Sequence, residues 1–237
     1  MTDTRSSFLR GVRASLPFLI VVAPFGLLFG VVATEAGLNL FESMTFSVMV
    51  FAGASQFAAL QLMQDNAPLF VVLATSLAVN LRMVMYSVAM APHLGAAPFG
   101  TRMLMAYFLV DQSFAASAVE FEKNPALTTP QKVAFFFGAV VPVAPMWFAS
   151  SLIGAAVGQT IPPEYALDFA LPITFLAMCA PLMRSLPHLV AAGVSIALSL
   201  ALAWIPWGLG LLVATAIAMA TGALLEWQLE QRGPRHD

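Results

Sequence analysis

The sequence predicts an all-α, polytopic membrane protein with about seven or eight transmembrane helices. Hydrophobic residues make up 60% of the 237-residue chain and charged residues only 9%, whereas soluble domains average about 25% charged residues. The mean hydropathy is +0.86, and the apolar residues form runs of about 20, the length that crosses a bilayer as a helix. These runs do not alternate apolar and polar residues, as the strands of a membrane barrel would.

Eight apolar runs are candidate spans, and we expect each of them to cross the membrane once. In order they cover residues 15–33, 43–63, 68–90, 103–120, 133–157, 167–183, 188–204 and 207–226. The sixth run is short and contains proline, and only Ile205 and Pro206 separate the last two. Seven spans therefore remain an alternative to eight.

Basic residues predict which side of the membrane each connection faces. Eight of them flank the runs: Arg5, Arg10, Arg13, Lys123, Lys132, Arg184, Arg232 and Arg235. With eight spans these eight residues share one side, which the positive-inside rule makes cytoplasmic. The opposite side then has Arg102 as its only clear basic residue. We expect one domain over residues 1–237, with a cytoplasmic N-terminal segment (1–14), a helical bundle (15–226) and a cytoplasmic tail (227–237).

Two charged residues lie deep inside apolar runs, Arg82 in the third and Asp111 in the fourth. A charge at bilayer depth costs at least about 2.5–3.5 kcal/mol, so such residues pair with one another or line polar cavities. The planar guanidinium of Arg82 suits a carboxylate, either of a substrate or of Asp111. Asp111 is a candidate acceptor for a proton or for a substrate amino group. The alternative is a purely structural ion pair that fixes helix packing.

The middle of the second run predicts a broken helix. Gly53 and its small neighbours weaken the helix, while Ser55 and Gln56 supply hydrogen-bonding groups at mid-depth. A break of this kind exposes backbone N–H and C=O groups, which can bind the charged ends of a substrate. The alternative is a close contact between helices through small residues.

The candidate site combines polar residues from three consecutive runs. Gln56, Arg82 and Asp111 lie at comparable depth, which favours one midplane site over three unrelated features. The candidate substrate-binding residues are Gly53, Ser55, Gln56, Asn80, Arg82, Asp111 and Gln112, and Asp111 is also the candidate for proton coupling.

Several other functions lack their sequence signatures. The chain contains no nucleophile elbow, no paired-histidine zinc motif, no phosphate-binding loop and no dinucleotide fingerprint. Its one cysteine, Cys179, excludes an intrachain disulfide and a cysteine-based metal cluster. We therefore expect no enzyme, no cofactor and no metal site. Without a basic patch, nucleic acid is not an expected partner.

An internal repeat is a further possibility. Residues 25–57 resemble residues 148–180, because in both a helix rich in small residues leads through a glycine-containing acidic loop to a helix with a kinkable middle. Transporters are often built from such repeats. If runs one to four match runs five to eight, the two halves run parallel.

Four short motifs, taken in order, resemble the AzlC family. They are F-G-L-L-F-G from Phe25, F-A-G-A-S-Q-F from Phe51, N-L-R-x-x-x-Y-S from Asn80 and D-Q-S-F-A from Asp111. The resemblance implies a multi-pass permease of the bacterial inner membrane that exports branched-chain amino acids, driven by protons or another gradient. It also implies a small membrane partner of the AzlD type. The family commonly has histidine after N-L-R, where this chain has Met83.

These observations together predict a secondary transporter subunit for branched-chain or other small apolar amino acids. In this interpretation Arg82 holds the substrate carboxylate, or alternates between it and Asp111. The alternative is a membrane assembly or scaffold protein that transports nothing, in which the Arg82–Asp111 pair is structural.

Overall fold

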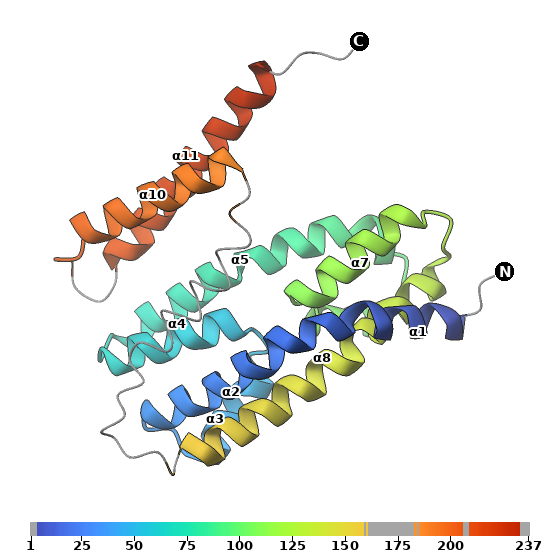
Figure 1. Ribbon diagram of the computed structural model, residues 1–237, viewed down its shortest axis with the longest axis horizontal. Helices are drawn as coiled ribbons and strands as arrows, with labels where there is room; N and C mark the ends of the chain where they lie inside the picture. The colour runs from blue at the N-terminus through green and yellow to red at the C-terminus, as the bar shows by residue number, and fades with distance from the viewer. Residues whose placement is uncertain (1–3, 159, 161–182, 184, 206–208, 233–237) are drawn as a thin grey trace. The chain divides into compact units, whose positions relative to one another are not determined.

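The computed structural model describes residues 4–158, 160, 183, 185–205 and 209–232. These residues form helices and turns and no strand, which confirms the all-α class. The helices are α1 (Thr4–Ser15), a 3-10 turn (Leu16–Phe18), α2 (Leu19–Glu35), α3 (Leu40–Met49), α4 (Gly53–Gln64), α5 (Leu69–Leu94), α6 (Phe99–Tyr107), α7 (Asp111–Lys123), α8 (Thr129–Gly158), α10 (Leu186–Ala201) and α11 (Leu209–Arg232) (Figure 1). The sixth predicted span, 167–183, lies outside the described residues except for Met183.

Four stretches of the described chain are long and apolar enough to cross a membrane as continuous helices. They are Thr4–Glu35, Leu69–Leu94, Thr129–Gly158 and Leu209–Leu229. The first includes most of the segment expected to precede the membrane, because α1 continues through the 3-10 turn into α2.

The chain forms two compact units. The first contains residues 1–60 and 76–166, and the second contains residues 61–75 and 167–237. In the second unit, α10 and α11 pack as an antiparallel pair. The first unit contains all the candidate site residues.

In the first unit, the α1–α2 segment runs parallel to α8 in close contact. A side chain at Gly30 would overlap with the backbone of Ser151 and Ala155, and one at Gly154 would overlap with the carbonyl group of Leu27. Small residues at such positions let two helix backbones approach closely. This pair of helices forms the frame against which the shorter helices pack.

The second predicted span is broken, as expected, but its two halves fold back on one another. Phe46 on α3 and Phe57 on α4 both contact Phe29 of α2, with ring centroids 6.0 and 5.9 Å apart. Eleven residues of continuous helix would separate these two rings by about 16 Å along the axis. We call α3–α4 the first hairpin; it enters the unit from the end at which α2 finishes.

The fourth predicted span is also a hairpin, formed by α6 and α7. The end of α7 lies at the end of the unit where α1 begins, which we call the N-terminal end (Figure 1). The start of α6 lies there too. Thr4 and Thr101 line one surface pocket there. Near the end of α7, Glu120 forms an ion pair with Arg10 of α1, with Nε and Oε1 3.0 Å apart. We call α6–α7 the second hairpin.

This geometry corrects the directions assumed for the second and fourth runs. Each of these runs returns toward the end of the unit from which it enters, because three non-helical residues at the break reverse the chain. Within the first unit Arg102 therefore lies at the same end as Arg10 and Lys132, and not at the opposite end as alternating spans would place it. It lies near the N-terminal end, where Lys132 contacts His93 of α5 with Nζ and Nδ1 3.2 Å apart.

The two hairpins make an inverted repeat of α2–α3–α4 and α5–α6–α7. In both halves a long helix is followed by four connecting residues, a short helix, a three-residue break and a second short helix. The long helices run in opposite directions, so the hairpins enter from opposite ends. Inverted repeats are a common plan of secondary transporters, with the site between the repeats. Residues 25–57 were expected to match residues 148–180 as a repeat, and most of that second copy lies outside the described residues.

Candidate functional site

The tips of the two hairpins meet inside the first unit. Phe51, in the break between α3 and α4, stacks on Tyr107 with ring centroids 5.8 Å apart and meets the edge of Phe108 at 5.6 Å. The hydroxyl of Tyr107 donates a hydrogen bond to the carbonyl oxygen of Val48. Each break is therefore held in place by residues of the other.

The two breaks share one backbone arrangement. In the first, the N–H of Ala52 donates to the carbonyl of Val50 at 2.8 Å; in the second, the N–H of Val110 donates to the carbonyl of Phe108 at 3.0 Å. A tight turn of this kind reverses the chain within three residues.

A serine at the third position of each following helix strengthens the same arrangement. The hydroxyl of Ser55 donates to the carbonyl of Ala52 at 2.9 Å, and that of Ser113 donates to the carbonyl of Val110 at 3.0 Å. The equivalence of Ser55 and Ser113 extends the inverted repeat to individual side chains. It also shows why the candidate residue Ser55 is required locally: it stabilises the turn.

Two helix N-termini consequently start at the meeting point, α4 at Gly53 and α7 at Asp111. The first backbone N–H groups of a helix have no partner within it, and the N-terminus carries a partial positive charge. At α7 the carboxylate of Asp111 lies in this field. At α4 the first residue is glycine, so the corresponding N–H groups have no side-chain carboxylate in front of them.

Arg82 and Asp111 form the predicted ion pair. Nη2 of Arg82 lies 3.3 Å from Oδ2 of Asp111, and the hydroxyl of Tyr86 donates to Oδ1 at 2.7 Å. Tyr86 in turn stacks on Phe114, with ring centroids 4.2 Å apart. The side chains of Arg82 and Asp111 remain 31% and 39% exposed, so the pair is accessible to a ligand.

Three of the candidate residues carry buried polar atoms without a hydrogen-bond partner. They are both amide atoms of Gln56, Oδ1 of Asn80 and Nε of Arg82. An unpaired buried polar group costs about 1–3 kcal/mol, so it is usually retained where water or a ligand completes its bonding. Two of these residues, Asn80 and Arg82, belong to α5, the helix that contributes Arg82 to the ion pair.

The structure brings only part of the predicted set into direct contact. Gln56 is fully buried and hydrogen-bonds neither Arg82 nor Asp111. A side chain at Gly53 would meet the rings of Phe25 and Trp147, so this residue packs against the aromatic core. Gln112 occupies the second position of α7, next to Asp111.

Sequence reasoning did not assign site roles to Tyr86, Phe51 or Tyr107. Tyr86 could have been assigned one, because it lies four residues after Arg82 and therefore on the same helix face. Phe51 and Tyr107 meet only because both hairpins reverse, and no local pattern indicates that. Among the described residues, no three His, Cys, Asp or Glu side chains gather as a metal site would need.

Comparison with known proteins identifies the family. The AzlC protein family profile matches residues 17–161, more than half of the chain and all of both hairpins. The chain belongs to the AzlC family. It is 28% identical over 178 residues to the inner membrane protein YgaZ of Escherichia coli, covering 73% of this chain and 71% of that protein. No solved structure matches the chain.

More distant relatives belong to other microorganisms. The chain is 27% identical to an uncharacterised membrane protein of Archaeoglobus fulgidus, over 75% of this chain and 76% of that one. It is 26% identical to an uncharacterised membrane protein of Helicobacter pylori strain J99, over 72% of this chain and 75% of that one. The AzlC family is one of membrane transporters, and this protein is a membrane protein of that family.

Proposed function

We propose that this AzlC-family protein is a secondary transporter that exports branched-chain or other small apolar amino acids across the bacterial inner membrane. The observation that carries the proposal is the Arg82–Asp111 pair at the point where two oppositely directed hairpins meet. Secondary transporters bind substrate at the junction of inverted repeats, where the N-termini of half-helices face anionic groups.

In this proposal the substrate replaces the internal ion pair. Its carboxylate binds Arg82 and the free N–H groups at the start of α4, and its ammonium group binds Asp111. Ser55, Gln56, Asn80 and Gln112 supply hydrogen bonds. The empty and loaded states then differ in the partners of Arg82 and Asp111, so that substrate binding can shift the conformational equilibrium.

Asp111 is also the proposed site of proton coupling. In the empty protein the carboxylate of Asp111 contacts Arg82 and accepts a hydrogen bond from the Tyr86 hydroxyl. Asp111 binds either the substrate ammonium group or a proton, so after the substrate has left it can accept a proton from the side to which the site is open.

The N-terminal end of the first unit is the proposed cytoplasmic side. It holds basic residues of α1, α6, α7 and α8, including Arg102, and this distribution agrees with the positive-inside rule.

A small AzlD-type partner belongs to the proposal. On α5 the exposed side chains of Leu77, Leu81 and Met85 offer an apolar face to lipid or to such a partner.

Transport by the purified protein tests this function. The chain is reconstituted into lipid vesicles, alone and with an AzlD-type protein, and uptake of labelled amino acids is measured with and without a pH gradient. We expect leucine, isoleucine and valine to be transported, and lysine to be excluded because Asp111, the one carboxylate among the proposed binding residues, already holds the substrate's ammonium group. Absence of transport of every amino acid under all conditions would contradict the proposal.

A further inference from the structure

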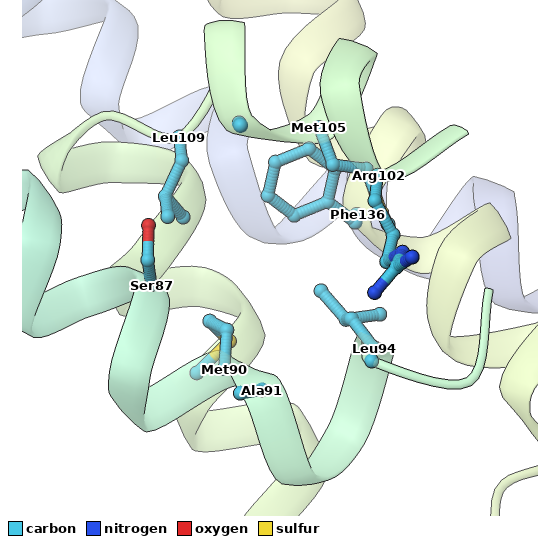
Figure 2. Close-up of a pocket in the computed structure, with 10 residues that line it drawn as sticks. Ser87, Met90, Ala91, Leu94, Arg102, Met105, Leu109 and Phe136 are labelled. Carbon is cyan, nitrogen blue, oxygen red and sulfur yellow. The ribbon is translucent and has the colours of Figure 1, made fainter. Parts of the chain in front are cut away.

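A pocket of about 210 Å³ lies in the first unit between α5, α6 and α8. Its wall is mostly apolar and includes Met90, Leu94, Met105, Leu109 and Phe136 (Figure 2). None of the residues proposed above to bind the substrate's charged groups lines it. The α5–α6–α8 pocket is therefore a distinct feature next to the candidate site.

The pocket extends from the hairpin tip toward the N-terminal end. Ser87 and Leu109 lie at one side of it, and Leu94 and Arg102 lie at the other (Figure 2). Leu109 belongs to the break between α6 and α7, two residues before Asp111. Ser87 follows Arg82 by five residues on α5. The inner part of the pocket thus begins two residues along the chain from Asp111 and about 7.5 Å along the α5 axis from Arg82.

We propose that the α5–α6–α8 pocket receives the aliphatic side chain of the transported amino acid and limits its size. This inference rests on the proposed function. With its carboxylate and ammonium groups at Arg82 and Asp111, a bound amino acid can direct its side chain past Leu109 into the pocket.

The lining suits an unbranched or branched aliphatic chain. A volume of about 210 Å³, compared with about 30 Å³ for each molecule of liquid water, holds several carbon atoms. Met90 and Met105 are flexible and polarizable, and such side chains adapt to ligands of different shape. Ser87 is the one hydroxyl in the lining and Arg102 its one charged group.

Aromatic side chains fill the other side of the candidate site. There, Phe25 and Phe29 contact Phe57 and Trp147, with ring centroids 4.7 to 5.9 Å apart. All four side chains are buried. An aliphatic chain could enter that region only by displacing aromatic rings, so of these two regions of the described chain the pocket is the one that can hold it.

The test fills the pocket without touching the charged groups. Ala91 lines the pocket, whereas Ala89, two residues away on α5, does not, and both residues are exposed. Two residues of helix correspond to a rotation of about 200°, so Ala91→Leu fills the pocket and Ala89→Leu is its matched control. Ala106→Leu fills the pocket from α6 and serves as a second variant if the first does not fold.

Uptake of labelled alanine, valine, leucine and methionine into vesicles is measured for each variant. In apolar pockets one methylene group changes discrimination by about 10- to 200-fold, so Ala91→Leu should raise the alanine-to-leucine transport ratio at least about tenfold. Ala89→Leu should leave the ratio unchanged.

An unchanged ratio in both filled variants, with transport retained, would overturn the pocket assignment while the proposed function stands. An equal loss for all four amino acids would also overturn it, and would instead indicate that lipid occupies the space. If the unsubstituted protein transports none of them, the proposed function fails and this inference fails with it.

Discussion

Replacing Asp111 with asparagine should abolish transport and leave the protein folded in the membrane. Asparagine has nearly the same shape and can still accept a hydrogen bond from Tyr86, but it carries no charge to pair with Arg82 or with a substrate ammonium group. We expect uptake into vesicles to fall at least about 100-fold, because a hydrogen bond to a charged group contributes about 1.5–3 kcal/mol and the proton-coupling group is lost as well. Size-exclusion chromatography in detergent should show a normal elution profile.

Glu120→Gln is the matched control. Glu120 lies on the same helix as Asp111 and also forms an ion pair with an arginine, Arg10, but it does so at the N-terminal end of the unit. The Glu120→Gln variant should transport normally. If Glu120→Gln and Asp111→Asn reduced transport equally, loss of any ion pair on α7 would explain the result.

The double variant Arg82→Gln/Asp111→Asn distinguishes a substrate-binding ion pair from a purely structural one. If the pair only fixes helix packing, each single substitution leaves one unpaired charge and lowers stability and transport. Removing both charges should then restore most of that stability and transport, since no unpaired charge remains. In a transporter the double variant should be stable but inactive. Recovery of transport in the double variant would contradict the roles proposed for Arg82 and Asp111.

Gly154→Ala should have the largest effect on folding. Alanine raises helix propensity by about 1 kcal/mol over glycine, but at this position its Cβ would overlap with the backbone carbonyl of Leu27. Backbone atoms cannot rotate away, so α8 must separate from α2. Overpacking in a closely packed interior costs about 1–3 kcal/mol, which outweighs the gain in propensity.

Gly100→Ala provides the comparison for this prediction. Gly100 lies in α6, and a Cβ there would meet no atom within 4 Å. The melting temperature in detergent should therefore fall for Gly154→Ala and stay the same or rise for Gly100→Ala. A Gly154→Ala protein as stable as the parent would show that α2 and α8 are not in the close contact described.

Much of the fold could be predicted from hydropathy, because an apolar run reports where a helix lies. It does not report the direction of the chain. The first hairpin (Leu40–Gln64) and the second (Phe99–Lys123) are each as long as a span, and a break of three residues leaves the mean hydropathy almost unchanged. Arg102, the one basic residue expected on the side opposite the others, was the one sign in the sequence against the assumed alternation of sides.

The candidate site was predictable to a similar extent. A charge in an apolar run must find a partner, so Arg82 and Asp111 could be paired from the sequence, and the structure confirms this. The positions of Phe51 and Tyr107 depend on a contact between two hairpins distant in sequence. That contact is tertiary, and neither residue type nor spacing indicates it.

The central claim is that the two hairpins enter from opposite ends, and single-cysteine labelling tests it most directly. In a Cys179→Ser background, cysteine is placed at Ala96 before the second hairpin, at Asn124 after it, and at Phe41 at the start of the first; all three residues are exposed. A membrane-impermeant maleimide is applied to right-side-out and inside-out vesicles. Positions 96 and 124 should be labelled from the same side and position 41 from the other. Labelling of position 96 from the side of position 41 would contradict the second hairpin, and with it the proposed site.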